Sequence, residues 1–67
     1  MNQIIRNALI KMYEGNIAKA NANIEVYLRN PAGIGEHPDI LAAIDHQIDQ
    51  AAMNQEKLNY IKNLPST

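Results

Sequence analysis

The stretch NPAGIGEHPD at residues 30–39 interrupts a chain that is otherwise patterned as helix. Its opening Asn-Pro step ends a helix, because a proline ring disfavours the α-helical conformation for the residue before it. Gly33 and Gly35 permit the backbone to reverse its direction. Pro38 suits the first position of a new helix, where its missing N–H does no harm. The sequence therefore predicts an all-α fold, an antiparallel two-helix hairpin.

The apolar pattern on either side of this stretch sets the expected bounds of the two helices. We expect a helix over about residues 3–29, a turn over 30–37 and a helix over about 38–63. In this arrangement His37 precedes the second helix, and Asp39 lies in its first turn. A chain of 67 residues is long enough for one domain only.

Each expected helix carries a stripe of residues at alternating spacings of three and four, the heptad pattern by which helices of a coiled coil pack. Folding the chain at about Ile34 brings Ile17 opposite Ala51, and each alanine of the stripes then meets an isoleucine. Gln55 is the polar member; either the Tyr13 hydroxyl satisfies its amide or it lies at a solvated edge. The predicted seam consists of Ile10, Tyr13, Ile17, Ala20, Ile24 and Tyr27 in the first helix and Leu41, Ile44, Ile48, Ala51, Gln55 and Leu58 in the second.

A second apolar set lies off this seam, toward the end of the hairpin opposite the turn. It forms either a wider core at that end or a contact surface, since exposed apolar patches mark interfaces. A short chain without cysteine has no disulfide to stabilise it, and association is the usual remedy. We therefore expect a homodimeric four-helix bundle, or docking on a protein partner, with Leu9 and Ile61 near the centre of the contact. The predicted interaction surface consists of Ile5, Leu9, Met12, Ile61 and Leu64.

Composition and charge argue against several classes of partner. A net charge of −1 does not suit a nucleic-acid-binding protein, which normally carries a basic excess. No apolar run approaches the ~18 residues that a membrane span requires, so no membrane partner is expected. Residues 1–6 lack the charged start and long apolar stretch of a signal peptide. Together with the absence of cysteine, this favours a cytoplasmic location.

No motif or arrangement of residues in the sequence predicts catalysis. The chain has no nucleophile, phosphate-binding or dinucleotide-binding motif, and a two-helix hairpin offers little concave space to exclude water from a reaction. Asp45, His46 and Asp49 are close in sequence. The chain has only two histidines, however, and neither has the spacing to another ligand that zinc or di-iron sites use. We therefore expect these three residues to form a solvated surface and no metal site. We therefore expect a non-enzymatic protein with no cofactor and no small-molecule substrate.

Two features of the first helix do not follow from helix propensity. Gly15 costs about 1 kcal/mol relative to alanine in a helix interior. It marks either the close approach of another backbone, which we favour, or a bend. The asparagines at positions 2, 7, 16, 21, 23 and 30 form an unusual polar surface, which either hydrogen-bonds a partner or reflects an AT-rich genome.

The stretches KMYEGNIAKA at 11–20, VYLRNP at 26–31 and GIGEHPD at 33–39 resemble small uncharacterised helical-hairpin proteins of large tailed bacteriophages. The resemblance covers about residues 10–64. It implies a phage-encoded viral protein, expressed in the cytoplasm of a bacterial host or associated with the virion. It further implies a role in virion assembly or in binding a host component.

These observations favour a protein–protein interaction module, acting in virion assembly or on a host protein. The alternative is a dimeric hairpin regulator that binds RNA, similar to the Rop family. Its candidate cations are Arg6, Lys11 and Lys19, whose scatter around the first helix does not form the basic stripe that RNA binding needs.

Overall fold

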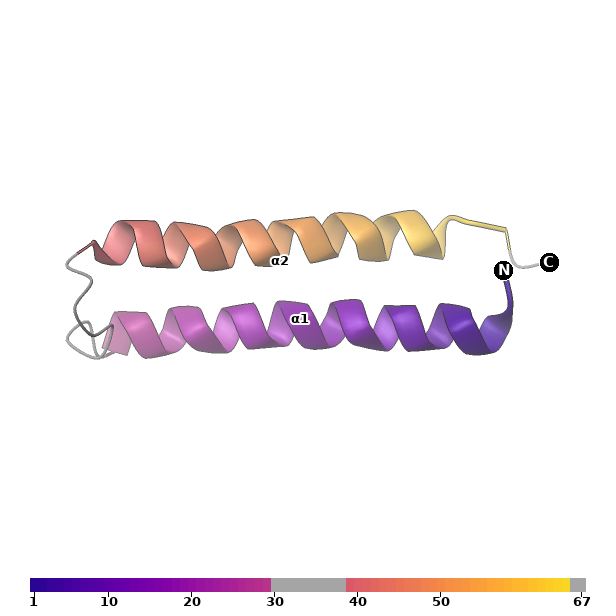
Figure 1. Cartoon of the computed structure of the whole chain (residues 1–67), viewed down its shortest axis with the longest axis horizontal. Helices are drawn as coiled ribbons and strands as arrows, with labels where there is room; N and C mark the ends of the chain where they lie inside the picture. Colours follow the sequence, from indigo (N-terminus) through magenta and orange to yellow (C-terminus); the bar gives the residue numbers. More distant parts are fainter. Residues whose placement is uncertain (30–38, 66–67) are drawn as a thin grey trace.

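Two long helices make up the part of the chain that the computed structural model describes, residues 1–29 and 39–65. Helix α1 spans Gln3–Arg29 and helix α2 spans Ile40–Lys62. The helices pack side by side and antiparallel, with the start of α1 next to the end of α2 (Figure 1). Within the described ranges there is no strand. The prediction of an all-α helical hairpin is therefore confirmed.

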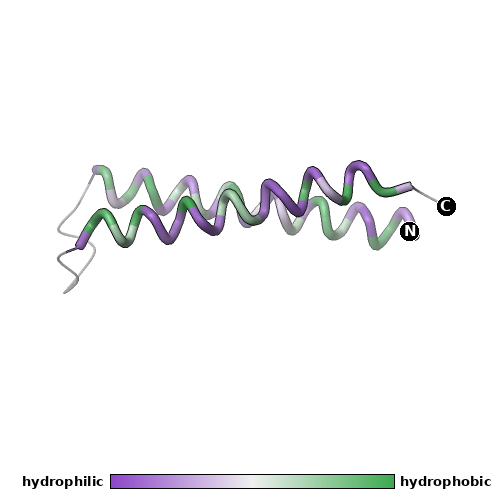
Figure 2. The backbone as a smooth tube through the Cα atoms, turned by 90° about the horizontal axis from the view of Figure 1, so that it is seen from above, coloured by the Kyte–Doolittle hydropathy of each residue, from purple (hydrophilic) through white to green (hydrophobic). Residues whose placement is uncertain are grey.

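The hairpin is a slender rod with principal extents of 49 × 15 × 15 Å. Hydrophobic and hydrophilic positions alternate along both helices in the view from above (Figure 2). Among the described residues, each helix packs against the other along one stripe of its surface.

Side-chain caps explain where the helices begin. The Asn2 side-chain oxygen accepts a hydrogen bond from the N–H of Ile4 at 2.7 Å at the start of α1. At the start of α2, Asp39 Oδ1 accepts from the N–H of Ala42 at 2.9 Å. Asp39 is thus the N-cap and lies outside the first turn, so α2 begins two residues later than expected. The turn expected over residues 30–37 lies outside the described residues.

Arg6 connects the first turn of α1 to the end of α2. Its two guanidinium Nη atoms donate hydrogen bonds to the backbone carbonyls of Leu64, at 2.7 Å, and Lys62, at 2.9 Å. Carbonyls at a helix C-terminus lack partners within the helix, and a cation there also complements the helix dipole. The N-terminal amine donates to the Pro65 carbonyl at 3.5 Å. These contacts hold the start of α1 and the end of α2 together, at the end of the hairpin opposite the turn.

The core lies along the line where the two helices meet. Among the described residues, the buried ones are Ala20, Asn54, Leu58 and Ile61. The α1 half of the predicted seam lies along this line. Ala20 is 1% exposed, and half-buried side chains accompany it at Ile10, Tyr13, Ile17, Ile24 and Tyr27.

The α2 half of the predicted seam is wrong at three positions. Leu41 and Ile48 are 77% and 52% exposed, and Gln55 is also exposed. The residues immediately before them face α1 instead: Ile40 and Gln47 are half-buried and Asn54 is buried. The predicted seam and the observed helix contact share Ile44, Ala51 and Leu58, which are half-buried or buried. Helix α2 is therefore rotated by about 50° from the expected orientation, half of the 100° step per residue.

The two helices are also shifted along each other. Folding at Ile34 would pair residue 54 with residue 14, but the structure pairs Asn54 with Asn16. Likewise Gln47 contacts Asn23, two positions from its expected partner. Two residues correspond to a shift of about 3 Å along the helix axis. The shift and the rotation together bring amide side chains of the two helices into hydrogen-bonding distance. The packing predicted from the apolar stripes alone does not bring them together.

Candidate protein-interaction surface

A ladder of amide side chains runs along one side of the helix contact. Asn16 Nδ2 donates to Asn54 Oδ1 at 3.0 Å, and Asn23 Nδ2 donates to Gln47 Oε1 at 3.1 Å. Asn54, only 4% exposed, also donates through Nδ2 to the Gln50 carbonyl at 2.8 Å. No buried side-chain nitrogen or oxygen within the described residues lacks a partner. Two of the asparagines that helix propensity leaves unexplained thus connect α1 to α2.

Helix geometry places these amides and the isoleucines of α1 on opposite sides of the contact. Ala20 is at the centre of the α1 stripe, with 1% of its surface exposed. A residue three positions later lies about 60° to one side, and a residue four positions later about 40° to the other. Asn23 therefore lies on the first side and Ile24 on the second. The same relation holds one heptad earlier, for Asn16 and Ile17.

The same division applies to α2. A hollow of about 260 Å³ on the amide side is lined by Asn16, Lys19, Ala20, Asn23, His46, Gln47, Gln50 and Asn54. It shows that the amide-bearing sides of the two helices coincide. Their aliphatic sides must then coincide on the opposite surface. Ala51, four positions after Gln47, lies on that surface together with Ile44 and Leu58.

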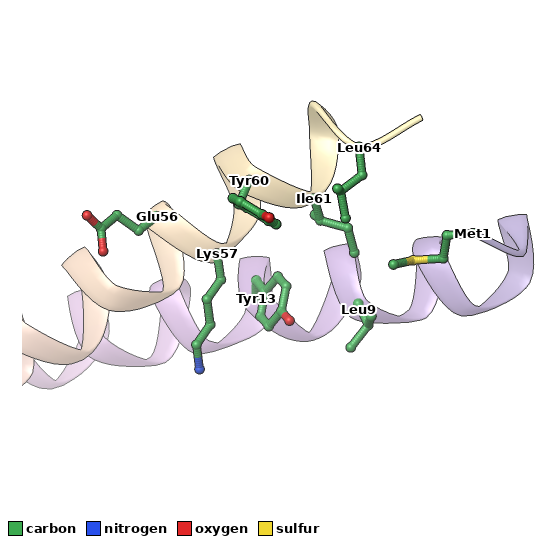
Figure 3. A pocket seen from close by; sticks show the side chains of 8 residues that line it. All are labelled: Met1, Leu9, Tyr13, Glu56, Lys57, Tyr60, Ile61 and Leu64. Atoms are coloured by element: carbon green, nitrogen blue, oxygen red, sulfur yellow. The ribbon is translucent and has the colours of Figure 1, made fainter. Parts of the chain in front are cut away.

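A larger depression lies at the end of the hairpin where α1 begins and α2 ends. We call it the terminal groove; it is open to solvent and has a volume of about 460 Å³. Side chains of both helices converge on it in Figure 3. Lys57 Nζ lies 5.9 Å from the centroid of the Tyr13 ring, a distance at which a cation is attracted to an aromatic face. The groove is lined by Met1, Leu9, Tyr13, Glu56, Lys57, Tyr60, Ile61 and Leu64.

Three members of the predicted interaction surface line the terminal groove, and the other two are exposed on α1. Leu9, Ile61 and Leu64 line the terminal groove, while Ile5 and Met12 are exposed, at 56% and 51%. Ile61 is only 4% exposed. The hairpin itself therefore covers most of the Ile61 side chain, and the contact expected around it stays a prediction.

The sequence interpretation missed several residues of this region. Tyr60 is 71% exposed beside the groove, but it follows no stripe that would have singled it out. The sequence indicates Arg6 only as a candidate cation for RNA. Its acceptors are backbone carbonyls at the far end of the chain, and no pattern of side chains signals such a contact.

Three of the basic residues have partners within the hairpin. Arg6 donates to carbonyls of α2, Lys57 lies over Tyr13, and Arg29 Nε is 3.2 Å from Glu25 Oε2. Within residues 1–29 and 39–65, no three metal-binding side chains form a group. Nor does that part of the chain contain a helix with both the length and the hydropathy of a membrane span.

Comparison with known proteins adds no assignment: no protein-family model, curated protein or solved structure matches this chain. The resemblance to small phage proteins stays a hypothesis that rests on the residues quoted for it.

Proposed function

We propose that this chain is a non-enzymatic protein–protein interaction module that binds an apolar segment of a protein partner in the terminal groove. The observation that carries the proposal is the groove itself, a depression of about 460 Å³ between two helices whose ends are held together. Apolar and aromatic side chains supply most of its lining. Pockets of this composition accept the anchor residues that dominate binding energy at protein interfaces.

Exposed apolar side chains near the groove extend the available contact. Met12 and Tyr60 are 51% and 71% exposed, and Ile5 lies on the same side of α1 as Met12, one heptad earlier. Large apolar side chains left in water cost free energy that a partner recovers by covering them. The resemblance to phage proteins would place such a partner in the virion or among host proteins.

The RNA-binding alternative receives less support from the charges. Arg6 is committed to the carbonyls of α2. Lys11 and Lys19 are exposed but eight residues apart, which separates them by about 12 Å along α1 and about 80° around it. A phosphate backbone is bound by cations aligned along one surface.

The test is capture in bacterial cells followed by direct titration with the purified captured protein. Tyr60→Ala removes an exposed aromatic side chain beside the groove, and Ile4→Ala is the matched control, because Ile4 is 80% exposed and does not line the groove. We expect Tyr60→Ala to weaken binding about tenfold or more and Ile4→Ala to leave it unchanged. Equal effects of the two variants would contradict the assignment of the groove, and capture of RNA would favour the alternative function.

A further inference from the structure

The hairpin carries a second apolar surface that the terminal groove does not include. On the side opposite the amide ladder, branched aliphatic residues recur along both helices. Leu28, Leu41 and Ile48 are 60%, 77% and 52% exposed there, and the others are half-buried or buried. We call this surface the aliphatic face. It consists of Ile10, Ile17, Ile24 and Leu28 of α1 and Leu41, Ile44, Ile48, Ala51 and Leu58 of α2.

The position of this face relative to the seam matches a four-helix arrangement. In a bundle of four helices in a square, the bundle axis lies about 45° from the direction of each adjacent helix. The isoleucines of α1 follow the seam residues Tyr13 and Ala20 by four positions, a rotation of about 40°. In α2, Ala51 and Leu58 have the same relation to Gln47 and Asn54. The hairpin thus turns its most apolar residues toward the place where the axis of a larger bundle would run.

The exposed area indicates how much surface is left to cover. The chain exposes 4983 Å², whereas a compact monomer of 7.5 kDa exposes about 4,250 Å². The excess over that value, about 700 Å², is close to the roughly 800 Å² that each partner buries in a standard interface. The excess over a compact monomer is therefore of the order of one half of a stable dimer contact, and the elongated shape of the hairpin contributes to it.

A second copy of the chain has the properties that the occupant needs. An occupant with two antiparallel helices suits this face, because its aliphatic residues lie on both helices. Its margins are polar: Gln55 follows Ile48 by one heptad, and Asn21 and Glu14 precede Leu28 by one and two heptads. A two-fold symmetric dimer supplies such an occupant from identical residues.

We propose that the aliphatic face is the self-association surface of this chain, and that two hairpins pack through it into a four-helix bundle. Ile17, Ile48 and Ala51 lie near its centre, and the amide ladder stays on the outside. The proposal rests on the proposed role as an interaction module, but it uses another surface. It also moves the expected dimer contact away from Ile5, Met12 and the terminal groove.

Two substitutions with nearly equal starting exposure test it. Ile48 and Met12 are 52% and 51% exposed, and they lie on opposite sides of the hairpin. We expect Ile48→Glu to raise the dimer dissociation constant by roughly a hundredfold or more, because the new carboxylate would be buried without a partner. Met12→Glu should leave self-association unchanged. Sedimentation velocity of the purified full chain across a wide concentration range measures both.

Leu41→Glu is a second variant that keeps the proposal testable if Ile48→Glu fails to fold. Leu41 is exposed in the hairpin and lies in the first turn of α2, where a negative charge favours the helix. It should also weaken the dimer, with helical content by circular dichroism unchanged. A wild-type chain that stays monomeric would overturn the proposal, as would dissociation by Met12→Glu alone. Either result leaves the terminal groove to be judged by the Tyr60→Ala titration.

Discussion

A single buried amide, Asn54, explains which side of α2 turns toward α1. Its side chain donates to the Gln50 carbonyl and accepts from Asn16, so its polar atoms have partners in the hairpin. Rotating α2 to the orientation that hydropathy favours would replace Asn54 by Gln55 at the contact. A polar residue at such a position fixes the register of paired helices at some cost in stability.

Removal of that amide should therefore weaken the hairpin. We expect Asn54→Ala to lower the free energy of unfolding by about 1–3 kcal/mol, because Asn16 loses its acceptor and a small cavity forms. Asn21→Ala is the control, since Asn21 is exposed, and it should change stability by less than about 0.5 kcal/mol. Urea unfolding at one protein concentration measures both variants. Equal changes would show that the amide ladder does not stabilise the contact.

The surroundings of Gly15 differ from the expected ones, in which another backbone packs against this residue. A Cβ atom at this position would meet nothing within 4 Å, so the hairpin leaves open space around the glycine. We expect Gly15→Ala to raise the free energy of unfolding by about 1 kcal/mol, because alanine has the higher helix propensity. Thermal unfolding measures the change. A lower melting temperature would mean that an unseen partner approaches the backbone here.

At the scale of the helices, the sequence predicts α1 better than α2. The bounds Gln3–Arg29 match the expected ones, and the apolar stripe of α1 faces its neighbour. The stripe of α2 misleads because Ile48 is more apolar than Gln47, which faces α1 in its place, while hydropathy does not distinguish Leu41 from Ile40. Hydropathy identifies the most apolar surface of a helix, but here that surface is only partly covered by the hairpin. The terminal groove depends on contacts between chain ends that no local pattern contains.

Close packing between the helices depends on Ala20. Because this residue is 1% exposed, a larger side chain has no room there. We expect Ala20→Leu to cost about 1–3 kcal/mol of stability through overpacking. Ala18→Leu, at an exposed position of α1, should be nearly neutral. Chemical denaturation compares the two, and similar unfolding curves for both variants would show that α1 is oriented differently.

At the scale of the whole molecule, the hairpin is a narrow rod with one groove at its end and one aliphatic face along its side. Its internal contact buries few residues and includes an amide among them. Such a contact leaves much of the apolar surface of both helices in water, and the interaction module that we propose would use this surface to bind. The two surfaces lie on different parts of the rod, so a dimer formed through the aliphatic face would still present its terminal grooves to other proteins.

The most direct test of the dimer is an isotope-filtered NMR measurement on a mixture of labelled and unlabelled chains, which detects only contacts between copies. We predict intermolecular contacts from the methyl groups of Ile17 and Ile48, and none from Met12. Intermolecular contacts confined to Ile5 and Met12, or the absence of any contact between copies at concentrations where the chain is folded, would contradict this account.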